Sequence, residues 1–103
     1  MRMMMKINIP VKSGNAAARE GKLGSTIQSI LDELKPEAAY FTDDKGKRTA
    51  FLFINIESSS EIPKIAEPWF LAFNAEVELH PAMDPEDLEK AGPWIAEAVN
   101  TYS

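Results

Sequence analysis

The chain's only histidine, His80, lies two positions after Glu78. If residues 76–80 form a strand, these two side chains point to the same face of a sheet. Glu78 could then orient the imidazole of His80 for work as a general base. The ordinary alternatives are an exposed histidine at a strand end and rim charges at an interface, and neither needs a catalytic role.

The composition removes several other kinds of site. The chain has no cysteine, which excludes thiol catalysis, disulfides and thiolate metal sites. One histidine with carboxylates is sparse for zinc, and a haem needs a clear proximal ligand, so we expect no metal and no cofactor. No glycine-rich phosphate loop and no nucleophile elbow occurs in the sequence.

Charge and length narrow the class of protein further. The 103 residues carry 11 Lys and Arg against 16 Asp and Glu, a net charge of −5, with no basic run. We therefore expect no nucleic-acid partner and no membrane partner. Hydrophobic residues make up 45% of the chain and charged residues 26%, which is typical of one soluble globular domain, here residues 1–103. No apolar stretch approaches the ~20 residues of a membrane helix, and we expect a cytoplasmic location.

The first half of the chain predicts a strand, a helix and a hairpin. Residues 3–9 alternate between apolar and more polar positions until Pro10. A turn at residues 13–15 precedes a helix over residues 16–34, whose first half is weakened by Gly21 and Gly24 so that the helix could begin at Gly24 instead. Residues 38–42 and 49–56 form strands on either side of a polar connection.

The second half predicts a helix, a strand and a last helix. Ser58 or Ser60 could cap the middle helix, and we prefer Ser60 because Pro63 then falls where no N–H is needed. Pro68 should kink or split this helix. After the strand over residues 76–80, Asp84 followed by proline starts a helix that Gly92-Pro93 should interrupt.

This βαββαβ order predicts an α+β, ferredoxin-like fold. Its four strands form an antiparallel sheet of order 4-1-3-2, with the helices on one face. Residues 51–56 are apolar at every position but Asn55, so the third strand should be covered on both sides. Since the helices cover only one face, we expect a second copy of the chain to cover the other and form a homodimer.

Several stretches resemble a small uncharacterised bacterial family of the dimeric α+β-barrel superfamily. They are Ile9-Pro10-Val11, Leu34-Lys35-Pro36-Glu37-Ala38-Ala39-Tyr40-Phe41, Glu67-Pro68-Trp69-Phe70 and Pro85-Glu86-Asp87-Leu88. The resemblance spans nearly the whole chain and implies the fold and a homodimer with a barrel between its sheets. Relatives in the superfamily include cofactor-free monooxygenases, muconolactone isomerases, chlorite-dismutase-like haem enzymes, stress-response barrels and regulatory domains, so it implies no single activity.

Strand parity predicts which side chains line such a barrel. If Met3, Met5, Ile7 and Ile9 face the helices, the intervening residues face the barrel. On the third strand either face is possible, and Asn55 favours the set that contains it. The predicted ligand-binding residues, beside His80 as a candidate catalytic residue, are Lys6, Asn8, Tyr40, Phe51, Phe53, Asn55 and Glu78.

Three functions remain open at this point. The first is binding of a small apolar or aromatic molecule between two sheets. The second is a cofactor-independent enzyme of the monooxygenase or isomerase type, with His80 as base and Asn8, Asn55 and Tyr40 placing the substrate. The third is a structural or regulatory module whose barrel is filled by its own side chains.

Overall fold

Four antiparallel strands form one sheet in the computed structural model, which describes residues 1–103. The strands are β1 (Arg2–Ile9), β2 (Ala38–Asp44), β3 (Lys47–Asn55) and β4 (Glu76–Pro81), and their order is β2-β3-β1-β4. The helices are α1 (Val11–Arg19), α2 (Leu23–Leu34), α3 (Ile62–Phe73) and α4 (Pro85–Tyr102), with a short 3-10 turn, η1 (Ser59–Glu61), before α3. The predicted α+β, ferredoxin-like topology is confirmed.

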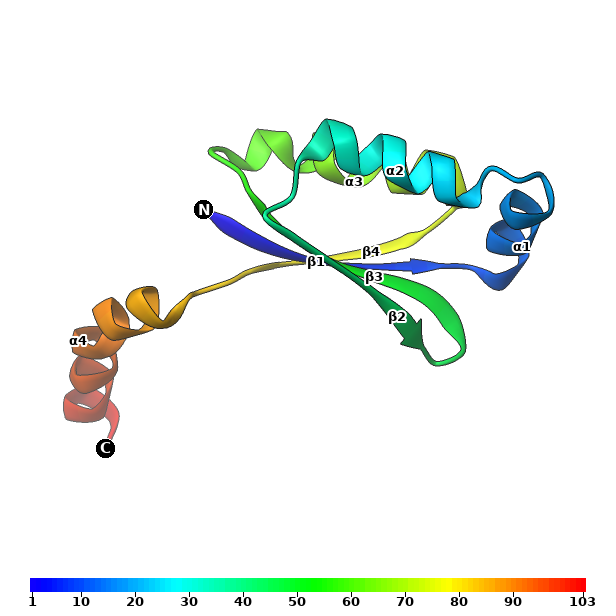
Figure 1. The fold of residues 1–103 in the computed structure, drawn as a ribbon. Coiled ribbons are helices and arrows are strands. Elements are labelled where there is room, and N and C mark those ends of the chain that lie inside the picture. The colour runs from blue at the N-terminus through cyan, green and yellow to red at the C-terminus, as the bar shows by residue number, and fades with distance from the viewer.

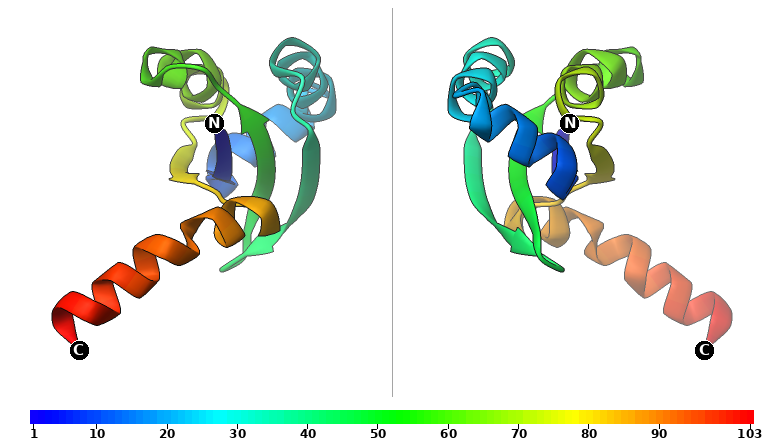
Figure 2. Two further views of the ribbon diagram at one scale, coloured as in Figure 1. Left: turned by 90° about the vertical axis from the view of Figure 1, so that its left-hand side faces the viewer. Right: turned by 90° about the vertical axis from the view of Figure 1, so that its right-hand side faces the viewer.

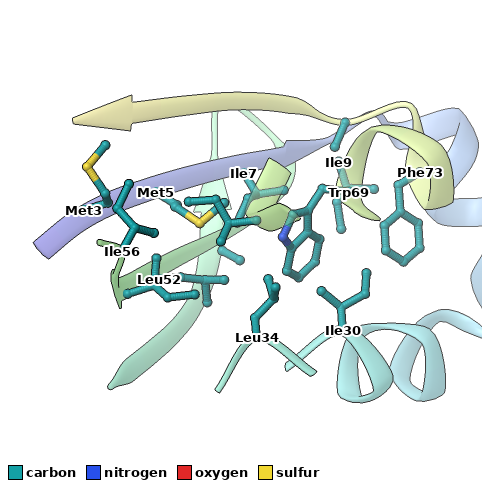
Figure 3. Packing of buried hydrophobic residues seen from close by; sticks show 14 residues of the cluster. Met3, Met5, Ile7, Ile9, Ile30, Leu34, Leu52, Ile56, Trp69 and Phe73 are labelled. Atoms are coloured by element: carbon teal, nitrogen blue, oxygen red, sulfur yellow. The ribbon is translucent and has the colours of Figure 1, made fainter. Parts of the chain in front are cut away.

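Helices α2 and α3 lie side by side over one face of the sheet (Figures 1 and 2). The core lies between these two helices and the sheet, where Met5, Ile7 and Leu52 of the sheet meet Trp69 and Phe73 of α3 (Figure 3). These five side chains are at most 2% exposed. The predicted alternation of β1 is confirmed, because its odd-numbered apolar residues are all buried, and of the even-numbered ones only Asn8 is buried as well.

The predicted helix over residues 16–34 is in fact two helices. Gly21 has a φ of +73°, a left-handed conformation that glycine adopts readily, and it separates α1 from α2. Helix α1 begins at Val11, directly after Pro10, so the predicted turn at residues 13–15 is wrong. Ser13 instead donates a hydrogen bond from α1 to the carbonyl of Phe73, at 2.5 Å, which ties α1 to the end of α3.

The hairpin is tighter than predicted. Lys45 and Gly46 form a two-residue turn in which both have positive φ, 53° and 77°, the geometry of a type I′ turn. Both strands consequently extend to the turn, and Asp44 stands opposite Lys47.

Neither internal proline splits its helix. Pro68 lies within a continuous α3 and Pro93 within a continuous α4, so a split at Pro68 and an interruption at Gly92-Pro93 are wrong. In α3 the burial of neighbouring apolar residues outweighs the lost backbone hydrogen bond. The cap before α3 also differs from the preferred one: Ser58, paired with Glu61 in a capping box, caps η1, and α3 continues from it.

Helix α4 projects from the side of the sheet opposite α2 and α3 (Figures 1 and 2). Asp84 caps it with Asp87, as the sequence predicts. None of its residues is buried. Its extension gives the chain a radius of gyration of 17.1 Å, against about 13 Å for an ordinary domain of 100 residues. Neither α4 nor any other helix combines the length and the apolar character that crossing a bilayer requires.

Candidate functional site

The residues predicted to line a barrel all lie on the sheet face that α2 and α3 leave uncovered, which we call the open face. On β1, Lys6 stands between Phe51 of β3 and Glu78 of β4. The other predicted residues follow from the same register. Tyr40 stands opposite Phe51, and the other even-numbered residues of β1 stand opposite Thr49, Phe53, Asn55, Glu76 and His80. The preference for Phe51, Phe53 and Asn55 over their neighbours agrees with burial, because Leu52 and Ile54 are in the core. Their role in binding remains a prediction.

One end of the open face is polar and hollow. A cavity of about 150 Å³ lies between the hairpin and strands β1 and β4. Its lining combines three predicted binding residues with Glu76, on the same strand face as Glu78, and with three hairpin residues that were not predicted; the seven are Lys6, Asn8, Asp44, Lys45, Lys47, Glu76 and Glu78. The signal that could have found the missed hairpin residues is the two-residue turn, which extends both strands along this face.

Lys6 is a fixed positive charge in this hollow. Its Nζ lies 2.8 Å from Oδ2 of Asp44. The hydrogen bond to Asp44 raises the pKa of Lys6, and the negative charges of Asp44 and Glu78 add to the effect. The same hydrogen bond lowers the pKa of Asp44. Lys6 therefore stays protonated at neutral pH and is not suited to remove a proton.

Asn8 is anchored within the sheet. Its Nδ2 donates to Oγ1 of Thr49 at 2.8 Å, and the Thr49 hydroxyl donates to the carbonyl of Lys47 at 3.0 Å. Asn8 and Thr49 are both buried although they lie on the open face. This chain of hydrogen bonds fixes the amide of Asn8 and leaves its Oδ1 as the group that could accept from a ligand.

The middle of the open face is aromatic. Phe51 and Phe53 are half-buried, and Tyr40 is 65% exposed. None of the three lines a cavity in the single chain. They form an apolar surface instead, directly beside Lys6.

The remaining two predicted residues lie toward the other end of the face. Asn55 stands opposite Arg2, and its Nδ2 is 3.5 Å from Oε2 of Glu37, which also pairs with Arg2. Nε2 of His80 lies 3.9 Å from Oε2 of Glu78, and both side chains are more than half exposed. The structure thus brings Lys6, Asn8 and Glu78 into one hollow, but places Asn55 and His80 outside it.

A second cavity, of about 220 Å³, lies on the helix side of the sheet. Nothing in the sequence predicts this cavity. Its lining is mostly apolar and consists of Ile9, Ile27, Phe41, Thr42, Arg48, Thr49, Ala50 and Trp69. Nowhere in the chain do three His, Cys, Asp or Glu side chains gather as they would around a metal ion.

No model of a known protein family matches the chain, and no curated protein matches it. Among solved structures it is similar to the 5-chloro-2-hydroxyhydroquinone dehydrochlorinase TftG from Burkholderia phenoliruptrix AC1100, in a complex with 2,5-dihydroxybenzoquinone. The two share 18% identity over 84% of this chain and 97% of the other, with a TM-score of 0.62. This similarity shows that the fold is shared.

Two further structures match less well. The designed protein Ferredog-Diesel has 12% identity over 79% of this chain and 85% of its own, with a TM-score of 0.46. A formyltetrahydrofolate deformylase from Pseudomonas putida KT2440 has 14% identity over 80% of this chain and 29% of its own, with a TM-score of 0.48.

Proposed function

We propose that residues 1–103 act as one domain of the dimeric α+β-barrel type, which pairs with a second copy and binds a small aromatic molecule between the two sheets. The observation that carries the proposal is the open face, where Phe51, Phe53 and Tyr40 lie uncovered beside the charged hollow around Lys6. An apolar surface on a central strand is typical of an interface. We also propose that the chain is related to the small bacterial barrel family that it resembles, and that it is located in the cytoplasm.

A second copy would also cover α4. Its apolar side chains, among them Trp94 at 73% exposed and Ile95 at 57%, have no partner within the chain. Because α4 projects on the open side of the sheet (Figure 2), two copies that meet through their open faces bring each α4 toward the other copy. Most of the stability of a helix in a protein comes from the packing of its apolar face, so this contact would stabilise α4.

The open face also suggests the class of ligand. Aromatic walls favour a flat ring, and Lys6 favours an anionic oxygen on that ring. TftG, which shares the fold, was solved with a hydroxylated quinone. We therefore propose a hydroxylated aromatic or quinone ligand, with its ring on Phe51 and Phe53 and an oxygen near Lys6.

The test combines assembly with binding. Light scattering at micromolar concentration should give the mass of a dimer. Titration with 2,5-dihydroxybenzoquinone, followed by amide shifts in NMR, should move the signals of Phe51, Phe53 and Lys6. Lys6→Ala should weaken binding about tenfold, whereas the control Lys64→Ala, on the outside of α3, should leave it unchanged. A stable monomer, or equal affinity of the two variants, contradicts the proposal.

A cofactor-independent enzyme of the monooxygenase or isomerase type is the second candidate. The observation that favours it is the pair His80 and Glu78, 3.9 Å apart on the open face. His80 would act as base, while Asn8, Asn55 and Tyr40 would place the substrate. His80→Ala should then abolish turnover of hydroxylated aromatic substrates while it leaves their binding intact. Unchanged turnover would exclude this enzyme.

A barrel filled by its own side chains is the third possibility. It predicts a dimer that binds none of these molecules, so the same titration separates it from the first two.

A further inference from the structure

The cavity on the helix side of the sheet is a gap in an otherwise packed core. Its walls come from both layers of the fold: Ile9 and Ala50 from the sheet, and Ile27 of α2 and Trp69 of α3 from the helices above it. Phe41, on the edge strand β2, closes one side and is 54% exposed. Its volume of about 220 Å³ is below the usual range of roughly 300–1,000 Å³ for ligand pockets, so only a small molecule fits.

A single cationic side chain borders this apolar cavity. Arg48 stands opposite Ile9 and Asp43 in the register of the sheet and therefore points to the helix side. Its Nη1 donates to Oδ1 of Asn15 at 3.1 Å. Arg48 forms no ion pair within 4 Å, not even with Asp43 across the hairpin. The guanidinium is thus held in place while its charge has no carboxylate partner.

Gly14 of α1 provides the space for this guanidinium. A Cβ atom at this position would lie 2.7 Å from Nη1 of Arg48 and 3.2 Å from Cγ2 of Ile9. No other glycine in the chain has a neighbour this close. Gly14 lies inside a helix, where glycine is otherwise unfavourable. The free-energy cost of a glycine inside this helix is explained if the position of the Arg48 guanidinium is needed for function.

Trp69, in the wall of the cavity, carries a buried polar atom without a hydrogen-bond partner. Its side chain is fully buried and lines the cavity. Its Nε1 is the one buried side-chain nitrogen or oxygen in the chain without a hydrogen-bond partner. Native cores rarely leave such groups unpaired, which sets this part of the core apart from the rest.

We propose that this cavity binds a small apolar monocarboxylic acid, with its apolar part against Trp69, Ile9 and Ile27 and its carboxylate on Arg48. A guanidinium matches the geometry of a carboxylate and can form two parallel hydrogen bonds with it. The apolar walls exclude a strongly hydrated anion such as phosphate. The site lies on the opposite side of the sheet from the open face, so it does not depend on the proposed dimer or its ligand.

The test uses two probes of nearly equal shape, phenylacetate and its neutral analogue phenylacetamide. NMR titration of the intact protein should show tighter binding of phenylacetate, by about tenfold, with shifts at Ile9, Ala50 and Trp69. Arg48→Gln should remove this preference and leave phenylacetamide binding unchanged. The matched control Arg19→Gln, at the exposed end of α1, should preserve the preference.

Either of two results would overturn the proposal. One is an acid preference that survives in Arg48→Gln. The other is a set of shifts confined to the open face around Lys6 and Phe51, which would assign acid binding to the site of the proposed function instead.

Gly14 gives a separate test as a positioning residue. Gly14→Ala should displace Arg48 and weaken phenylacetate binding at least fivefold, with little change for phenylacetamide. If this variant does not fold, Asn15→Ala removes the acceptor that holds Arg48 and should produce the same selective loss. An equal loss for both probes would mean that α1 only shapes the cavity and does not orient the charge.

Discussion

In the middle of β3, the two faces of the sheet differ far more in cover than in composition. On the helix side, Met5, Ile7 and Leu52 are completely buried under α2 and α3. On the open face, Phe51 and Phe53 come from the same strand as Leu52 and are only half-buried. Strand β3 is therefore apolar on both faces, but its own chain covers only one of them.

The same residue type therefore has different roles on the two faces. An apolar side chain on the helix side stabilises the fold of one chain, because its burial does not depend on a partner. An apolar side chain on the open face contributes to stability only when something covers it. The cavity beside Arg48 is the exception on the helix side, where cover is present but packing is incomplete.

The largest effect should come from the covered face. Trp69→Ala should lower the free energy of unfolding by about 3–5 kcal/mol, because it empties the centre of the core. Phe70→Ala is the matched control, since Phe70 is the next residue of α3 and is 40% exposed. Denaturant titration measures both. A similar loss in the two variants would show that the helix side is not the stabilising face.

A substitution on the open face should act on assembly instead. Phe53→Asp should weaken the proposed dimer by more than about tenfold, because it buries a charge in an apolar interface. Sedimentation equilibrium measures the dissociation constant. Leu71→Asp, at an 83% exposed position of α3, is the control and should leave assembly unchanged. An unaltered dimer in Phe53→Asp would place the interface elsewhere.

Hydrogen exchange should extend the comparison to the helices. Helix α3 buries four residues, whereas α4 buries none. In the monomeric Phe53→Asp variant, amides in the middle of α4 should exchange at least about tenfold faster than those of α3, because packing supplies most helical stability. In the wild-type dimer the difference should shrink. Equal protection of both helices in the monomer would show that α4 is stable without cover.

The smallest effect should come from the Lys6–Asp44 pair on the open face. The pKa of Asp44 is lowered in the folded chain by its hydrogen bond to Lys6, so its contribution to stability is present above its unfolded pKa of about 3.9 and is lost as pH falls through the folded pKa. The pKa of Lys6 is raised, so its contribution is lost as pH rises through that value. Asp44→Asn should flatten the acid side of the stability profile slightly, as followed by thermal unfolding, and Asp43→Asn should not. An identical acid side in wild type and Asp44→Asn would contradict this linkage.

The sequence was sufficient to predict the sheet and the faces of β1 and β4, and for β3 it left two faces open, of which Asn55 favoured the observed one. Alternation in β1 and the doubly apolar β3 are local patterns, and strand parity converts them directly into faces. The tight hairpin could not be predicted as reliably, because Lys45 adopts a positive φ that its residue type does not indicate.

The features that the sequence did not reveal depend on contacts between distant residues. Gly14 was interpreted as part of a turn, but it lies in a helix, and Arg48 of β3 occupies the space that a side chain at this position would need. The cavity beside Trp69 has the same origin, since its walls come from three strands and two helices. The hollow around Lys6 was predicted only in part, because Asp44 and Lys47 reach it through the hairpin geometry.

Helix α4 is joined to the sheet by a short hinge and can move as a lever. Only residues 82–84 separate it from β4, and Arg2 holds this hinge by accepting from the amide of Ala82 and by an ion pair with Asp84 at 3.4 Å. With 18 residues, α4 is a lever about 27 Å long, so a rotation of about 10° at its base moves its tip by about 5 Å. Salt that screens the Arg2–Asp84 pair should therefore allow the tip of α4 to move over a wider range. The helix would pivot about the first residues of β1.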